Sequence, residues 1–314
     1  MNIPLHTLIG ARGFLLFSFE IILMHKSDGL QALEKPLTSL PLTLRNLILE
    51  RLQGLTQYEP VIGIMGKTGA GKSSLCNALF AGDVSPVSDV SACTREALRF
   101  RLRSGERSML LVDLPGVGES AQRDSEYEAL YRRMLPELDL VVWVIKADDR
   151  ALAVDEQFYH RVMAGYQQRV VFVVNQVDKV EPCHEWLRED NAPSPHQHHT
   201  IARKVAELQR LFSPRNPIGV VSARMGWGLA PLVDILMRSL PDRATSPLAT
   251  QLHPRLCTEP VKAQARDSFG QAVGEVLDTA AAFSWFPAPL KTVIQHVRDV
   301  VVSVARAVWD WIFF

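Results

Sequence analysis

The sequence has no excess of charge of either sign. Its 34 lysines and arginines balance 34 aspartates and glutamates, so the formal net charge at pH 7 is +0. A protein that holds nucleic acid or anionic lipid over a broad surface carries a basic excess, so any such contact here would have to be local. The hydrophobic share of 47% and the charged share of 22% are typical of a folded globular protein and exclude a disordered one.

Cysteine is scarce and scattered. The four cysteines, Cys76, Cys93, Cys183 and Cys257, form no C-x-x-C pair. This spacing argues against a disulfide framework and against a zinc ribbon, and it favours a reducing compartment. We therefore predict a cytoplasmic protein.

Long apolar runs are missing as well. The run at residues 14–24 is shorter than the ~20 residues that a membrane span needs, and Glu20 interrupts it. Charged residues break the apolar C-terminus into an amphipathic pattern: Arg298, Asp299, Arg306 and Asp310. No transmembrane helix is predicted, whereas peripheral membrane contact stays open. Residues 1–23 have two open interpretations, a native segment or an upstream extension of a protein that starts at Met24.

Strand and helix patterns alternate through the middle of the chain. The apolar runs at 140–145 and 170–175 are typical of parallel strands covered on both faces. Shorter strand candidates lie at 61–65, 98–102, 109–113 and 218–222, with helical segments at 72–80, 125–135, 154–166, 200–211 and 229–240. This alternation predicts an α/β fold with a mostly parallel, doubly wound sheet.

The flanking segments differ from this pattern. A leucine-rich helix is predicted at 36–53 with Gly54 as its stop, and a stretch rich in Pro, Ser and Thr follows Pro241. We predict four parts: an N-terminal extension with the leucine-rich helix (1–54), the α/β domain (55–241), a linker (242–260) and an amphipathic helical hairpin (261–314).

Residues 66–73, G-K-T-G-A-G-K-S, match the phosphate-binding pattern G-x-x-x-x-G-K-[ST] and lie between an apolar strand and a helix. The glycines let successive backbone N–H groups turn inward around phosphates, and the helix N-terminus adds partial positive charge. Lys72 is expected to reach the β- and γ-phosphates, and the Ser73 hydroxyl to ligate Mg²⁺.

Three later segments favour guanine over adenine. D-L-P-G at 113–116 ends one apolar strand, N-Q-V-D at 175–178 ends another, and S-A-R at 222–224 follows the last. The Asp178 carboxylate can accept from N1–H and N2–H₂ of guanine, a donor pair that adenine lacks. Asn175 is expected to brace the loops around the base, and the Ala223 N–H to lie near guanine O6. An ATP-binding module is the alternative that Asp178 opposes.

Together these segments resemble the five conserved segments of a translation-factor-class small GTPase of the Era/MnmE branch. With Cys93-Thr-Arg-Glu96, the phosphate-loop segment is similar to the YfjP/YeeP-type predicted GTPases. The resemblance spans about residues 59–240 and implies a P-loop G domain that hydrolyses GTP to GDP as a switch. It also implies that Thr94, in a switch segment at about 83–95, contacts Mg²⁺ and the γ-phosphate.

The site residues predicted in this way fall into three groups. Lys72, Thr94 and Gly116 serve catalysis, and Ser73, Thr94 and Asp113 serve the Mg²⁺ ion. The expected nucleotide-binding residues are Gly66, Lys67, Thr68, Gly69, Ala70, Gly71, Lys72, Ser73, Ser74, Asp113, Gly116, Asn175, Gln176, Asp178, Lys179, Ser222, Ala223 and Arg224.

Three residues depart from the family pattern. Gln176 stands where relatives carry a lysine that covers the purine, so weaker guanine binding is expected. Val117 stands where Ras-like proteins carry a water-orienting glutamine, so slow intrinsic hydrolysis is expected. Gly69 replaces the asparagine of potassium-activated relatives, which puts activation by that route in doubt.

The remaining features leave partners open. The histidine-rich segment 193–199 matches no zinc spacing and is expected to be a solvated loop. The amphipathic C-terminus is expected to pack as a hairpin, with self-association or interfacial membrane contact as alternatives. Two kinds of partner stay open: a protein effector or ribonucleoprotein, and a second copy of the chain in a homodimer. An alternative function also stays open, that of a GTP-dependent assembly protein with little catalysis of its own.

Overall fold

The computed structural model describes residues 28–87, 97–117, 121–282 and 288–314. The chain divides into two compact units. One comprises Met1–Tyr58 and Arg266–Phe314, and the other is Glu59–Ala265.

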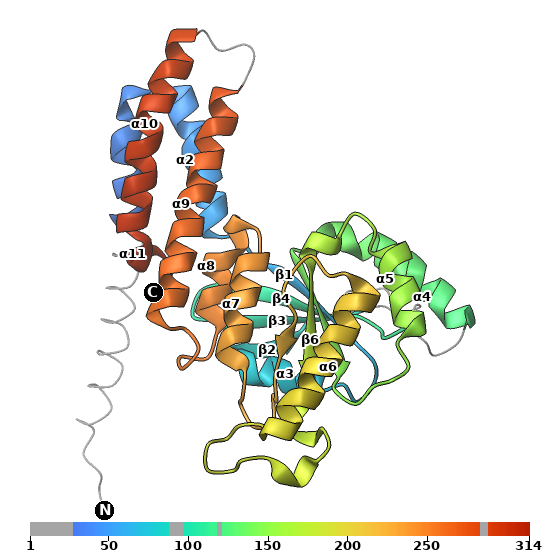
Figure 1. Ribbon diagram of the computed structural model, residues 1–314. Helices are drawn as coiled ribbons and strands as arrows, with labels where there is room; N and C mark the ends of the chain where they lie inside the picture. Colours follow the sequence, from blue (N-terminus) through green and yellow to red (C-terminus); the bar gives the residue numbers. More distant parts are fainter. Residues whose placement is uncertain (1–27, 88–96, 118–120, 283–287) are drawn as a thin grey trace, which may run out of the picture. The chain divides into compact units, whose positions relative to one another are not determined.

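A seven-stranded sheet forms the centre of the Glu59–Ala265 unit (Figure 1). Its strand order is β2-β3-β4-β1-β5-β6-β7. Strands β4, β1, β5, β6 and β7 pair in parallel, whereas β2, β3 and β4 pair antiparallel. The strands are β1 (Val61–Met65), β2 (Asp83–Pro86), β3 (Leu98–Ser104), β4 (Arg107–Asp113), β5 (Leu140–Lys146), β6 (Val170–Asn175) and β7 (Gly219–Val220). The predicted mostly parallel α/β sheet is confirmed.

Burial explains which strands the sequence pattern detects. β6 is buried throughout and β5 is buried up to Lys146, so both are continuous apolar runs. Every residue of β2 is exposed. This strand was missed because it lies at the sheet edge, inside the segment 83–95 that we had predicted as a switch.

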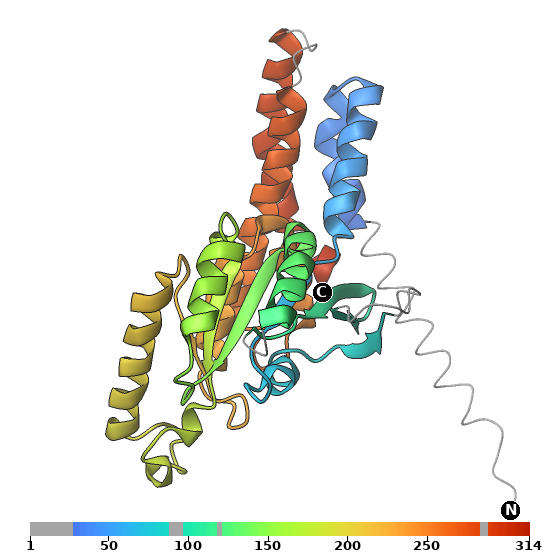
Figure 2. The same ribbon diagram turned by 90° about the vertical axis from the view of Figure 1, so that its right-hand side faces the viewer.

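Helices cover both faces of the sheet (Figure 2). Residues of α4 (Ala121–Met134), α5 (Ala153–Val162) and α6 (Pro195–Phe212) share one buried cluster with β5 and β6. α3 (Lys72–Leu79), α7 (Leu229–Ser239) and α8 (Asp242–Gln251) pack on the other face. The layers are therefore helix, sheet and helix, as a doubly wound sheet requires.

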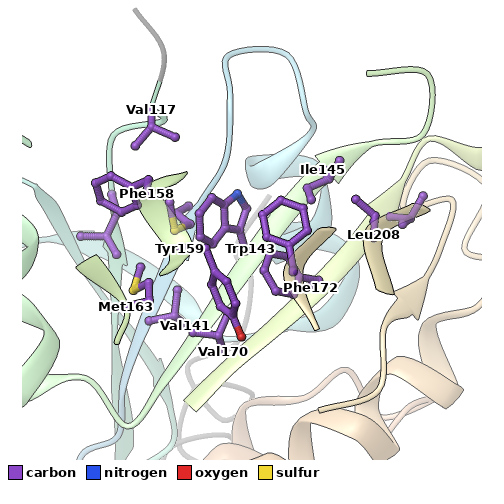
Figure 3. Packing of buried hydrophobic residues seen from close by; sticks show 14 of the residues in the cluster. Val117, Val141, Trp143, Ile145, Phe158, Tyr159, Met163, Val170, Phe172 and Leu208 are labelled. Carbon is purple, nitrogen blue, oxygen red and sulfur yellow. The ribbon is translucent and has the colours of Figure 1, made fainter. Parts of the chain in front are cut away.

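Aromatic rings from β5, β6, α5 and α6 fill the centre of the core (Figure 3). Trp143 on β5 is 1% exposed, and its ring centroid lies 5.2 Å from that of Phe172 and 6.2 Å from that of Phe158. Phe172 in turn lies 4.6 Å from Phe212 of α6. These edge-on and tilted contacts tie two helices to two central strands, whose carboxyl ends lead into the candidate site.

The linker predicted at 242–260 is wrong over its first half. Residues Asp242–Gln251 form helix α8, and most of its residues are buried. The Ala81 N–H donates to Gln251 O at 3.0 Å, so the end of α8 is tied to the end of α3. The composition is misleading because Pro247 lies inside this helix, where tertiary packing outweighs its poor helix propensity.

The second unit is helical. It contains η1 (Lys35–Ser39), α2 (Leu42–Thr56), most of α9 (Glu259–Ala281), α10 (Ala288–Ala307) and α11 (Trp309–Phe313). Gly54 does not stop the leucine-rich helix, because α2 continues through it to Thr56. Arg298 Nε of α10 lies 2.7 Å from Asp278 Oδ1 of α9, and Arg266 Nη2 lies 2.9 Å from Asp310 Oδ2. The helices of the predicted hairpin therefore run antiparallel and in contact.

No helix within the described parts of the chain has both the length and the apolar character that a membrane crossing needs.

Candidate nucleotide site

The carboxyl ends of parallel strands bring the predicted segments to one edge of the sheet. The loop after β1 begins at Gly66, β4 ends at Asp113, and β6 ends at Asn175. The loop after β7 carries Ser222 and contacts the segment after β6. In open α/β sheets this edge is where ligands bind.

The phosphate-loop backbone has a conformation that only glycine adopts readily. Gly66, Gly69 and Gly71 have φ values of 143°, 81° and 89°. A Cβ at Gly66 would collide with Val144 O, and one at Gly71 would collide with Asn175 Nδ2. The loop therefore packs directly on β5 and on the end of β6, and α3 begins immediately after it.

Lys72 and Asp113 face each other at the start of α3. The Lys72 Nζ donates to Gly66 O at 2.9 Å and lies 3.8 Å from Asp113 Oδ1. Burial raises the pKa of the Asp113 carboxyl above its ordinary value, and the Lys72 ammonium opposes that rise. Ser73 and Ser74 are exposed in the first turn of α3. Oxygen donors of this kind suit Mg²⁺, and an ammonium beside N–H groups suits phosphate.

Gly116 packs on the phosphate loop itself. A Cβ at Gly116 would lie 2.9 Å from Gly66 O and 3.0 Å from Lys67 Cα. Tyr131 of α4, which was not singled out in the sequence, donates its hydroxyl to Pro115 O at 2.7 Å. The D-L-P-G segment is thus held between the loop after β1 and a buried tyrosine.

Val117 points away from this site. Its side chain is 3% exposed and belongs to the core cluster that contains Phe158 (Figure 3). A buried aliphatic side chain cannot orient a water molecule, and its position in the core gives Val117 a packing role.

Asn175 bridges two loops. Its Nδ2 donates to Ala70 O at 2.9 Å, and its Oδ1 accepts from the Ala223 N–H at 3.1 Å. We had expected that N–H to face guanine O6, but in the structure it is bonded to Asn175. The Ala223 backbone therefore ties the loop after β7 to the end of β6.

Gln176 and Asp178 follow on the same segment. Gln176 has a left-handed backbone with φ of 65°, and its Nε2 donates to Gly69 O at 2.6 Å. The exposed Lys179 donates from Nζ to Gln176 Oε1 at 3.0 Å. Asp178 Oδ1 accepts from the buried Ser222 hydroxyl at 2.6 Å. The segment is thereby tied to both the phosphate loop and the loop after β7.

The remaining predicted site residues differ in their exposure to solvent. Thr68 and Arg224 are exposed, and Ala70 is buried. The side chain of Lys67 turns to Asp149, in the connection between β5 and α5, and to Asp155 in the first turn of α5, so only its backbone could serve a phosphate. Thr94, together with Cys93, lies outside the described residues.

The segment 193–199, which we predicted as a loop, is helical from Pro195 onward. Ser194 caps α6, which begins at Pro195, and forms a capping box with Gln197. His196 Nδ1 lies 2.9 Å from Glu185 Oε2. Among the residues that the structure describes, no three His, Cys, Asp or Glu side chains gather closely enough to hold a metal ion.

The cysteines allow a direct test of the packing beside the phosphate loop. Burial, reinforced by the negative charge of Asp113, raises the pKa of the Cys76 thiol to about 12, whereas Cys183 is exposed. At pH 8 almost no thiolate forms at Cys76, so iodoacetamide should alkylate it at least about tenfold more slowly than Cys183. Peptide mapping by mass spectrometry of the native protein measures both rates. Equal rates would contradict the packing, and denatured protein is the control.

Known proteins resemble this chain over the α/β unit and over nearly its whole length. The family model described as "50S ribosome-binding GTPase" matches residues 61–176. The "Uncharacterized protein YkfA" of Escherichia coli (strain K12) is 55% identical over 291 residues, which is 92% of this chain and 100% of YkfA. The "Uncharacterized protein YfjP" of the same strain is 54% identical over 291 residues, with the same coverage. The chain belongs to the family of YkfA and YfjP.

The α/β unit of this YkfA and YfjP family member is a P-loop GTPase G domain. Among solved structures, the chain is similar to a crystal structure of Aquifex aeolicus Era bound to GDP·AlF4⁻. The two sequences are 23% identical, the TM-score is 0.43, and the match covers 58% of this chain and 56% of the Era chain.

Proposed function

We propose that the protein binds GTP and GDP with Mg²⁺ and hydrolyses GTP slowly to GDP and phosphate, as a conformational switch of the Era/MnmE branch. The observation that carries this proposal is the convergence of Lys72, Asp113 and Asp178 at one edge of the sheet, where Asn175 and Gln176 tie together the loops after β1, β6 and β7.

Each residue has a defined task in this proposal. Backbone N–H groups of residues 71–74 and the Lys72 ammonium bind the phosphate oxygens. Ser73, Asp113 and Thr94 hold Mg²⁺, which neutralises charge on the β- and γ-phosphates when it is bound. Asp178 accepts from the guanine N1–H and N2–H₂, and the Gly116 N–H senses the γ-phosphate.

Slow turnover is part of the proposal. Val117 is buried in the core, so it offers no group that orients the attacking water. Gly69 has no side-chain oxygen that could ligate a monovalent cation. A protein effector, a ribonucleoprotein or a second copy of the chain would then supply the missing stabilisation.

Calorimetry and phosphate release test this function on the full chain. With MgCl₂ present, GTP and GDP should bind at least about tenfold more tightly than ATP, because adenine leaves the Asp178 carboxylate unpaired. Phosphate release should be about 10⁻³ s⁻¹ or slower, as for unassisted G domains, and KCl in place of NaCl should change it less than about twofold. Absence of heat with both guanine nucleotides would overturn the proposal.

A second candidate is a GTP-dependent assembly protein with little catalysis of its own. It is favoured by apolar exposure in the helical unit, where Val300 is 52% and Trp311 is 52% exposed. Against it, Ile294, Val301 and Ala305 of α10 are buried, as packing between the helices requires. Sedimentation with vesicles and light scattering, each with GTP and with GDP, separate the two: a nucleotide-dependent pellet or size change supports assembly.

A further inference from the structure

Three oxygens surround the ammonium of Lys67, the second residue of the phosphate loop. Lys67 Nζ donates to Asp149 Oδ2 at 2.9 Å and to Ala151 O, and it forms an ion pair with Asp155 Oδ2 at 2.9 Å. Asp149 and Ala151 belong to the connection between β5 and α5, and Asp155 lies in the first turn of α5. The Lys67 ammonium is therefore held by hydrogen bonds and ion pairs inside the protein.

The pair with Asp155 is largely shielded from water. The Asp155 side chain is 3% exposed and the Lys67 side chain 30%. Burial raises the pKa of the Asp155 carboxyl, and the hydrogen bond and charge of Lys67 oppose that rise. A buried carboxylate without a partner is strongly destabilising, so the two residues depend on each other.

The connection between β5 and α5 is itself held in place from the far side. The Ala151 N–H donates to Asp149 Oδ1 at 3.0 Å. Lys204 of α6 is buried, donates to Asp149 O, and pairs with Glu207 Oε2 at 2.9 Å. Lys67 therefore attaches the phosphate loop to a fixed point rather than to a free loop end.

The backbone of Lys67 in turn supports Gly116. Only glycine can pack this closely on the phosphate loop, because a Cβ at Gly116 would lie 3.0 Å from Lys67 Cα and 2.9 Å from Gly66 O. A shift of Lys67 would therefore move the surface on which Gly116 rests. The Ala70 N–H donates to Lys67 O at 3.1 Å, whereas the N–H groups of residues 71–74 lie further along the loop, in the turn that opens α3.

We infer that Lys67 is a positioning residue for γ-phosphate sensing: its ion cluster with Asp149 and Asp155 fixes the part of the phosphate loop against which Gly116 packs. The inference rests on the proposed GTP-binding function. It predicts an effect on GTP that GDP does not share, because only GTP has the γ-phosphate that Gly116 would contact.

The test compares the affinities of fluorescent GDP and a fluorescent non-hydrolysable GTP analogue, with MgCl₂, in the full chain. Lys67→Met should lower the GTP-analogue affinity about tenfold and the GDP affinity less than about threefold. Asp155→Asn should also lower the GTP-analogue affinity more than the GDP affinity. Lys67→Arg should keep at least half of the wild-type ratio of GTP-analogue affinity to GDP affinity. The matched control is Lys146→Met. Lys146 ends β5, its side chain is 40% exposed, and it pairs with Asp148 at 3.0 Å, a contact that involves no phosphate-loop residue.

Each outcome has a defined meaning. A folded Lys67→Met protein with an unchanged ratio of GTP to GDP affinity overturns the inference, as does an equal loss in Lys146→Met. If the buried charge left by Lys67→Met prevents folding, Lys67→Met combined with Asp155→Asn removes both charges, and the same loss of ratio is expected. Wild-type protein that binds neither nucleotide would instead defeat the proposed function.

Discussion

Asp178→Asn should lower the affinity for GDP and GTP by about 100-fold. The carboxylate accepts two hydrogen bonds from the guanine edge in the proposed complex, whereas an amide presents an N–H donor to one of those donors. Loss of a charged acceptor costs about 2–3 kcal/mol, which is about 30- to 150-fold in affinity. Xanthine carries an oxygen where guanine has N2–H₂, so the same variant should gain affinity for xanthosine diphosphate.

The local structure should tolerate the Asp178→Asn substitution. Asp178 Oδ1 accepts from the Ser222 hydroxyl at 2.6 Å, and the oxygen of an amide can accept the same bond. The loop after β7 should therefore stay tied, with a melting temperature close to that of the wild type.

Competition binding with GDP and xanthosine diphosphate measures the exchange of specificity. Asp190→Asn is the matched control, because Asp190 is an exposed aspartate in the segment between η4 (Val177–Lys179) and α6. A folded Asp178→Asn protein that keeps wild-type GDP affinity would show that this carboxylate does not face the base, and the guanine assignment would fail.

Local patterns predicted the elements that depend on local chemistry. The phosphate loop and the buried strands β5 and β6 are visible in the sequence because glycine spacing and continuous apolar runs are short-range signals. The start of α6 also had a local signal, since Ser194, Pro195 and Gln197 are the cap, first turn and capping-box residues of a helix. Its run of histidines obscured that signal.

Other features depend on contacts that sequence spacing does not reveal. Helix α8 exists because its residues are buried against the sheet, in spite of Pro247. Lys67 meets Asp149 across 82 positions of sequence, and Tyr131 donates to Pro115 O across 16 positions. The Ala223 N–H, which we predicted to face guanine O6, donates to Asn175 Oδ1, and only the arrangement of two loops determines that partner.

Lys72→Met should reduce the affinity for both GDP and GTP by about 100-fold. The Lys72 ammonium is the only charged donor that we assign to the phosphates, and loss of a hydrogen bond to a charged group costs about 1.5–3 kcal/mol for each contact. Methionine keeps the length and most of the apolar stem, so the packing at the start of α3 should persist. Fluorescent GDP titration measures the loss, and Lys35→Met, an exposed position in the helical unit, is the control.

Substitution of the two lysines of the phosphate loop should change nucleotide affinity in different ways. That difference distinguishes direct binding of the phosphates by a charge from positioning of the loop. Lys72 reaches the phosphates in the proposed complex, so its loss affects GDP and GTP together. The Lys67 ammonium binds Asp149, Asp155 and Ala151 instead, so its loss should lower the affinity for GTP much more than the affinity for GDP. If Lys72→Met left GDP binding intact while the protein stayed folded, the phosphates would have to lie elsewhere. Both the proposed site and the role of Lys67 would then be wrong, because each requires the phosphates to lie in this loop.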